Sequence, residues 1–128
     1  MKMDYNKTYN KILTDEEFME IKQHGSSAYP FQYYYDNLEL FDFHCIEWHW
    51  HREFEFLYVE SGQVTCGIGE KKIILSEGEA IFINSKILHQ FYASSDGVIP
   101  NFVCMPEFIA PENSLIYKKY ILPIISSN

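Results

Sequence analysis

The sequence is poor in basic residues and has no long apolar run. Ten Lys and Arg stand against eighteen Asp and Glu, which gives a formal net charge of −8. Domains that bind nucleic acid usually carry a basic face, so this balance argues against DNA contact by these residues themselves. No apolar stretch approaches the roughly 20 residues that a membrane-spanning helix requires, and the polar N-terminus lacks the apolar core of a signal peptide. We therefore expect a cytoplasmic protein that has no membrane partner.

Cysteine is also scarce, and its spacing excludes the common cysteine frameworks. The three residues Cys45, Cys66 and Cys104 lie far apart and form no CxxC pair. An odd number of separated thiols in apolar surroundings indicates reduced, buried side chains, as in cytosolic proteins.

The composition instead favours β-structure in a single domain. A length of 128 residues is typical of one domain. Aromatic residues make up 17% of the chain, with ten Tyr and ten Phe, and such residues are enriched in strands. Eight short β-branched or aromatic runs follow one another between positions 30 and 106: FQYYY, FHCIEWHWH, FEFLYVE, QVTCGIG, KKIILS, EAIFIN, ILHQFYA and VIPNFVCM. Nothing between 31 and 106 is long enough for a crossover helix, so the pattern predicts an all-β sandwich or barrel.

Helices are expected on both sides of this barrel. Thr14 and Glu17 match a capping box, Leu13 and Phe18 occupy its staple positions, and Gly25 is placed to end a helix, so a helix is predicted over about 15–24. Apolar residues at three- and four-residue spacing over 116–124 predict a short amphipathic C-terminal helix whose apolar stripe needs a partner. The predicted organisation is an arm over 1–29, a barrel over 30–107 and a C-terminal helical segment over 108–128.

Histidine and glutamate side chains gather in the middle of the predicted barrel. Residues two apart in a strand share a face, so Cys45, Glu47, His49 and His51 are expected on one side and Trp48 and Trp50 on the other, under the N-terminal helix. If the next strand keeps its phase, Glu55 joins the histidine side. Three ionisable groups on one apolar face each need partners to be buried, which makes simple packing a poor explanation for them. His24, at the end of the predicted surface helix, is expected to be solvated.

The spacing of these residues resembles the cupin superfamily. His49-x-His51-x-x-x-Glu55, followed after six residues by Gly62, resembles the first cupin motif, and GEAIFINSKILH, ending at His89, resembles the second. The resemblance implies a double-stranded β-helix, or jelly-roll barrel, and makes His49, His51, Glu55 and His89 the residues that would hold a metal. Such a donor set suits Fe, Mn, Ni, Cu or Zn. A hydrogen-bonded polar cluster without metal is the alternative.

The second motif departs from the usual cupin pattern at three positions. Asn84 and Lys86 stand where relatives usually have Pro and Gly, and Ala93 replaces a terminal Asn. The turn before His89 is still expected to form, because Asn is itself a turn residue.

The chain also resembles the N-terminal sensor domains of AraC-type transcription regulators. The stretches YPFQYYYD, HWHREFEFLYVESGQV and GEAIFINSKILHQF carry this likeness, and YKKYILPII resembles the passage into dimerisation helices. The resemblance implies a sensor that binds a small-molecule effector, such as a sugar, and forms a homodimer. DNA would be bound only through a C-terminal helix-turn-helix domain that is not present in this chain. The effector would contact His49, His51, Glu55, His89 and Phe91, with no cofactor expected and no catalytic residue.

Two other functions remain open at this stage. The complete set of four ligand-type residues makes a stand-alone metal-dependent cupin enzyme of the isomerase or dioxygenase type the alternative to the sensor. Aromatic content alone would also suit a carbohydrate-binding module. No Ser or Cys lies in a recognisable nucleophile setting, so catalysis by a covalent intermediate is not expected.

Overall fold

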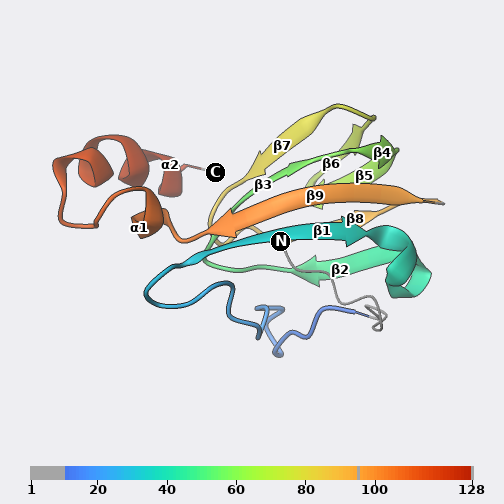
Figure 1. Cartoon of the computed structure of the whole chain (residues 1–128), viewed down its shortest axis with the longest axis horizontal. Helices are drawn as coiled ribbons and strands as arrows, with labels where there is room; N and C mark the ends of the chain where they lie inside the picture. The colour runs from blue at the N-terminus through green and yellow to red at the C-terminus, as the bar shows by residue number, and fades with distance from the viewer. Residues whose placement is uncertain (1–10, 95, 128) are drawn as a thin grey trace.

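The barrel consists of two antiparallel sheets that face each other (Figure 1). The computed structural model describes residues 11–94 and 96–127. One sheet has the order β1-β9-β3-β7, with β4 beside β9, and the other has the order β2-β8-β5-β6. The strands are β1 (Phe31–Asn37), β2 (Cys45–His49), β3 (Phe54–Tyr58), β4 (Ser61–Gly62), β5 (Val64–Ile68), β6 (Lys71–Leu75), β7 (Ala80–Ile83), β8 (His89–Tyr92) and β9 (Gly97–Cys104). Each of the eight predicted runs contains a strand, so the all-β jelly-roll prediction is confirmed.

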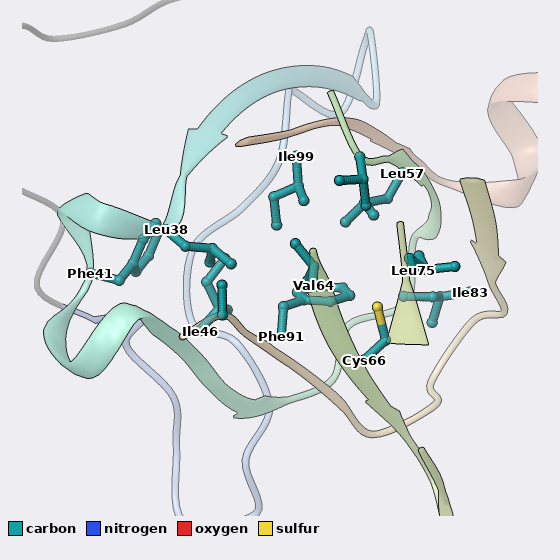
Figure 2. Close-up of a cluster of buried hydrophobic side chains, with 12 residues drawn as sticks. Leu38, Phe41, Ile46, Leu57, Val64, Cys66, Leu75, Ile83, Phe91 and Ile99 are labelled. Carbon is teal, nitrogen blue, oxygen red and sulfur yellow. The ribbon is translucent and has the colours of Figure 1, made fainter. Parts of the chain in front are cut away.

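The core fills the space between the sheets. Figure 2 shows inward-pointing side chains from both sheets and from the turn after β1, which contains the short helices η1 (Leu38–Leu40) and η2 (Asp42–His44). Val64 and Ile99 are completely buried there. Removing one such aliphatic side chain from water stabilises a fold by about 1.5–3 kcal/mol. Cys66 belongs to the same core as a free thiol, and burial raises its pKa to about 12, which makes it a packing residue.

The predicted helix over 15–24 is wrong. Residues 11–24 form a non-helical N-terminal segment that doubles back on itself, in which Thr14 pairs with Glu20 and Met19 pairs with Trp50. The Asp15 carboxylate accepts hydrogen bonds from the backbone N–H of Glu17 at 2.8 Å and of Met19 at 3.0 Å, and so closes a turn in place of a helix. Asp side chains offer the backbone this alternative to helical bonding.

The backbone of Trp50 explains why this alternative is favoured. Trp50 lies just beyond β2 and exchanges bonds with the segment, from Glu20 N–H to the Trp50 carbonyl and from Trp50 N–H to the Phe18 carbonyl, both at 2.9 Å. Phe18 takes a φ of 68° and its side chain is 52% exposed, so no hydrophobic staple with Leu13 forms. Tertiary pairing outweighs a weak local helix preference here. The first ten residues of the predicted arm lie outside the described residues.

An irregularity in β2 changes which residues face the interior. Ile46 pairs with Phe91, but the next pair is His49 with His89, so β2 has one extra residue at this point. Such a bulge turns the following side chains to the opposite face. Ile46 and His49 both lie in the interior, whereas Glu47 is exposed. The prediction that Cys45 and Glu47 share the histidine face is therefore wrong.

The C-terminal segment packs on one end of the barrel (Figure 1). It contains α1 (Pro106–Ile109), the π-helical turn η3 (Tyr117–Ile121) and α2 (Leu122–Ile125), so the predicted helical character is confirmed. Tyr117 and Ile121 are buried against Phe54 and Cys104, which means that the chain's own barrel covers this part of the apolar stripe. Tyr120, on the same helical stretch, remains 58% exposed. No helix in the described part of the chain is long and apolar enough to cross a membrane.

Candidate functional site

Four buried ligand-type side chains converge inside the barrel. His49 ends β2, His51 follows it in the loop, Glu55 lies on β3 and His89 begins β8. All four are buried, and their candidate ligand atoms lie within 4.8 Å of one another. The structure therefore brings together the four residues that the cupin resemblance singles out, from strands of both sheets.

Each of the three imidazoles is oriented in the same way. The ring Nδ1 bonds to a main-chain carbonyl two residues away: His49 to Glu47 at 2.9 Å, His51 to Glu53 at 3.1 Å and His89 to Ile87 at 2.7 Å. A carbonyl only accepts hydrogen bonds, so each ring carries a proton on Nδ1 and directs its Nε2 atom toward the interior. Metal-binding histidines are commonly held by this type of bond.

The charges within this cluster depend strongly on one another. His51 Nε2 lies 3.1 Å from Glu55 Oε1, and His89 Nε2 lies 3.4 Å from the same oxygen. Burial alone would raise the pKa of Glu55, but the hydrogen bond to His51 and the electrostatic attraction of the nearby His89 outweigh it and hold that pKa well below its usual range. Burial would lower the pKa of His51, yet the bond to Glu55 raises it overall. His49 behaves oppositely, because burial and the nearby His89 lower its pKa to about 4.

The cluster fits a divalent transition metal. Three imidazole nitrogens and one carboxylate oxygen are a donor set that Fe, Mn, Ni, Cu and Zn accept. His89 Nε2 is fully buried and, among the described residues, has no hydrogen-bond partner. Such an orphaned nitrogen is costly unless something binds it. An ion held here would supply Lewis-acid chemistry toward an oxygen of a bound molecule.

A cavity of ≈580 Å³ opens beside the cluster. Cavities of this size accommodate small organic ligands. Its barrel side includes His49, His51, Glu55 and Phe91, whereas His89 is not part of the lining. Its other wall is the N-terminal segment, which contributes the following residues: Lys11, Ile12, Leu13, Glu20, Ile21, Lys22 and His24.

A second polar group in the cavity was missed from the sequence. His24 is buried, contrary to the expectation that it is solvated, and its Nε2 lies 2.8 Å from the Glu20 carboxylate while its Nδ1 lies 2.5 Å from the Tyr34 hydroxyl. The His24 and His51 rings are 5.5 Å apart. Glu20 and His24 have the i,i+4 spacing of a helical pair, but here they meet in a segment that is not helical.

Asp36 on β1 and Asn101 on β9 extend this polar wall. The Asn101 amide donates to Asp36 Oδ2 at 3.0 Å and to the Ile99 carbonyl at 2.8 Å. Burial raises the pKa of Asp36 to about 6, and the Asn101 hydrogen bond only partly offsets it. Tyr34 and Asp36 are two apart in FQYYYDN and so face inward together. Because Tyr residues occupy both faces of that strand, the sequence gives no sign of which set lines a cavity.

Comparison with known proteins finds a match to a cupin family model over part of the chain. Residues 45–103 match the family model described as Cupin domain. A crystal structure of an RmlC-like cupin from Shewanella frigidimarina NCIMB 400 superimposes with a TM-score of 0.54 at 17% identity, covering 59% of this chain and 67% of that one. A cupin-2 domain containing protein from the same organism gives a TM-score of 0.50 at 20% identity, covering 64% and 82%. These likenesses agree with the jelly-roll barrel described above.

A similarity in sequence extends beyond the barrel. The chain is 28% identical over 119 residues to the uncharacterized HTH-type transcriptional regulator YdeC of Bacillus subtilis (strain 168). The match includes 91% of this chain but only 40% of the length of that relative.

Proposed function

We propose that this chain is the effector-sensing and dimerisation region of a helix-turn-helix transcriptional regulator of the AraC type. The proposal rests on the ≈580 Å³ cavity, whose walls come from both the barrel and the N-terminal segment. A molecule that fills the cavity contacts both parts, so its affinity depends on how they are arranged. Ligands shift a conformational equilibrium only through such differential affinity. The regulator-type relative supports the assignment.

The N-terminal segment is suited to respond to an occupant. Beyond the two main-chain bonds to Trp50, it is held by the Trp50 indole, whose Nε1 donates to the Glu17 carbonyl at 2.9 Å. Most of its residues are exposed, and segments with few buried contacts open at low free-energy cost. An effector that bonds to Glu20 or His24 would add contacts that exist only while the segment lies on the barrel.

A second connection runs from the histidine cluster to the C-terminal segment. The loop before β8 is tied to the cluster by the bond from Lys86 N–H to the His51 carbonyl at 2.8 Å. The same loop holds the C-terminal segment, because Asn84 Nδ2 donates to the carbonyls of Ile124 at 2.6 Å and Ser127 at 3.0 Å. Occupation of the cavity would thereby influence the segment that leads toward the remainder of a regulator.

Dimerisation and DNA binding are assigned to different parts of such a regulator. Leu115, Ile116 and Tyr120 are exposed on the C-terminal segment and would form the apolar interface of a homodimer. DNA would be contacted by a helix-turn-helix region outside these 128 residues, because a net charge of −8 disfavours contact by the chain itself.

The sensing proposal is tested by thermal melting of the EDTA-treated chain with a library of small metabolites. We expect at least one compound to raise the melting temperature of the wild type and to have no effect on Phe91→Trp, which reduces the cavity volume. Ile74→Trp, on an exposed side chain of β6, is the matched control and should retain the response. Absence of any stabilising compound, or equal stabilisation of Phe91→Trp, would contradict the proposal.

A metal-dependent cupin enzyme is the second candidate, and the convergence of His49, His51, Glu55 and His89 favours it. In this case protein purified without chelators should contain one transition-metal ion per chain by plasma mass spectrometry. His51→Ala should lose the ion, whereas His44→Ala, outside the cluster, should retain it. Metal-free wild-type protein, or protein in which His51→Ala binds metal as well as the wild type, would eliminate the enzyme candidate.

A further inference from the structure

The part of the cavity wall formed by Tyr34, Asp36 and Asn101 offers mainly hydrogen-bond acceptors. The Glu20 carboxylate can only accept, so the 2.8 Å bond to His24 places the ring proton on Nε2. His24 Nδ1 then accepts from the Tyr34 hydroxyl at 2.5 Å. The only proton of that hydroxyl is committed to His24, so the remaining lone pairs of Tyr34 Oη act as acceptors toward the cavity.

Asp36 and Asn101 continue the same pattern. Both hydrogens of the Asn101 amide are used, one by Asp36 and one by the Ile99 carbonyl, which leaves Oδ1 as an acceptor. Asn101 is the one hydrogen-bond donor that the described residues bring to the Asp36 carboxylate. A carboxylate has about four acceptor sites, so most of the capacity of Asp36 remains available.

The charge of this wall is also incompletely balanced. Glu20, Asp36 and Glu55 all line the cavity. The pKa of the Tyr34 hydroxyl is raised mainly by burial and, to a smaller extent, by the negative charges of these carboxylates. Glu20 and Glu55 have histidine partners within 3.1 Å, but no charged nitrogen of the described residues lies within 4.0 Å of Asp36. A buried carboxylate without a cation is unfavourable unless a ligand supplies one. The Lys22 ammonium also lines the cavity and lies 4.8 Å from the centre of the Tyr34 ring. Its charge partly offsets the effect of burial on the pKa of Asp36, but it forms no ion pair with that carboxylate.

We infer that the cavity takes a ligand with a cationic ammonium group, which is seated on Asp36, Tyr34 and Asn101 while an apolar body lies against Ile46 and Phe91. This inference rests on the proposed sensing function and names the chemical class of its effector. An anionic ligand would meet three carboxylates in the cavity, Glu20, Asp36 and Glu55, against two lysines, Lys11 and Lys22. Hydroxyl groups could donate to the same acceptors, but they would leave the Asp36 charge uncompensated.

Three fragments that share one apolar body test the inference: 2-phenylethylammonium, 2-phenylethanol and phenylacetate. Binding to the EDTA-treated chain is measured by saturation-transfer NMR and by calorimetric titration, so that no metal can ligate the amine. We expect the ammonium to bind at least about tenfold more tightly than the alcohol, because hydrogen bonds to a charged group are the stronger ones.

Variants separate the role of Asp36 from general effects. Asp36→Asn keeps the shape of the side chain and should bring the ammonium affinity down to that of the alcohol. Asp42→Asn, on an exposed residue of η2 outside the cavity, should leave it unchanged. Tyr34→Phe removes one acceptor and should weaken the ammonium several-fold, which provides a second measurement should Asp36→Asn fail to fold.

The outcomes distinguish this inference from the sensing proposal. Equal binding of the alcohol and the ammonium, or an ammonium affinity unaffected by both variants, would overturn the ammonium assignment and leave a cavity that still binds ligands. Binding of phenylacetate alone would overturn it in the same way. Absence of binding by all three fragments, together with a negative metabolite library, would overturn both.

Discussion

Acidification should destabilise this fold through His49, and replacing that residue should remove the effect. His49 is 3% exposed, and its pKa falls from an ordinary value of 6.5 to about 4 in the folded chain. Between pH values of about 6.5 and 4, His49 is protonated in the unfolded chain but remains neutral in the folded chain, so the free energy of unfolding falls as the pH falls. The full loss is about 3 kcal/mol, since each pH unit corresponds to about 1.4 kcal/mol. About 2 kcal/mol of it should appear between pH values of about 7 and 4.5.

The assay is urea denaturation of the EDTA-treated chain, followed by tryptophan fluorescence at the two pH values. His49→Asn retains a donor for the Glu47 carbonyl but cannot titrate, so it should lose about 2 kcal/mol less than the wild type on acidification. His51, whose raised pKa contributes stability at low pH that is lost as the pH rises, is present in both proteins and largely cancels. His44→Asn, outside the cavity, controls for the loss of a histidine elsewhere. An identical acid loss in the wild type and His49→Asn would refute this reasoning.

Three further predictions concern packing and backbone. Lys86 has a φ of 64°, so Lys86→Gly should stabilise the fold by about 1 kcal/mol in urea denaturation; destabilisation would contradict this. Ile121→Ala should cost about 2–4 kcal/mol, whereas Ile116→Ala, at an exposed position, should change stability by less than about 0.5 kcal/mol. In Gly67→Ala the new Cβ would lie 2.7 Å from the Trp48 ring, so a loss of about 1–3 kcal/mol and a shifted fluorescence emission are expected; unchanged emission would argue against the contact.

The strands could be predicted because their signal is local. Runs of β-branched and aromatic residues separated by Gly, Asn, Asp and Ser turns identify strands with little help from the rest of the chain. The second motif survives its departures for a local reason as well. Asn84 caps its own turn by accepting from Ser85 N–H at 2.8 Å, and Lys86 adopts the left-handed backbone that Gly would take more easily.

The N-terminal segment could not be predicted, because its competitor is distant in sequence. The capping-box pattern at Thr14 is a local signal for a helix. The backbone of Trp50, over thirty residues away, forms hydrogen bonds with the segment that are incompatible with that helix. The bulge in β2 could not be predicted from the sequence either, since it depends on the pairing of β2 with β8. The helix prediction also concealed His24, which a helix would have left on the surface and which the non-helical segment brings into the cavity.

The four-residue cluster was predictable and the acceptor-rich wall was not. His49, His51, Glu55 and His89 follow a recognisable spacing, so resemblance was enough to group them. Asp36 and Asn101 meet only through the pairing of β1 with β9, and no sequence spacing predicts that they lie close together.

The most direct test of the regulator assignment is the denatured mass of the polypeptide that carries these residues in its source cells, detected with an antibody to this domain. The sensing role predicts a mass larger than the 15.2 kDa of these 128 residues by at least one further domain of about 100–150 residues. A mass of 15.2 kDa would contradict it, and the metal-dependent enzyme would then become the leading candidate.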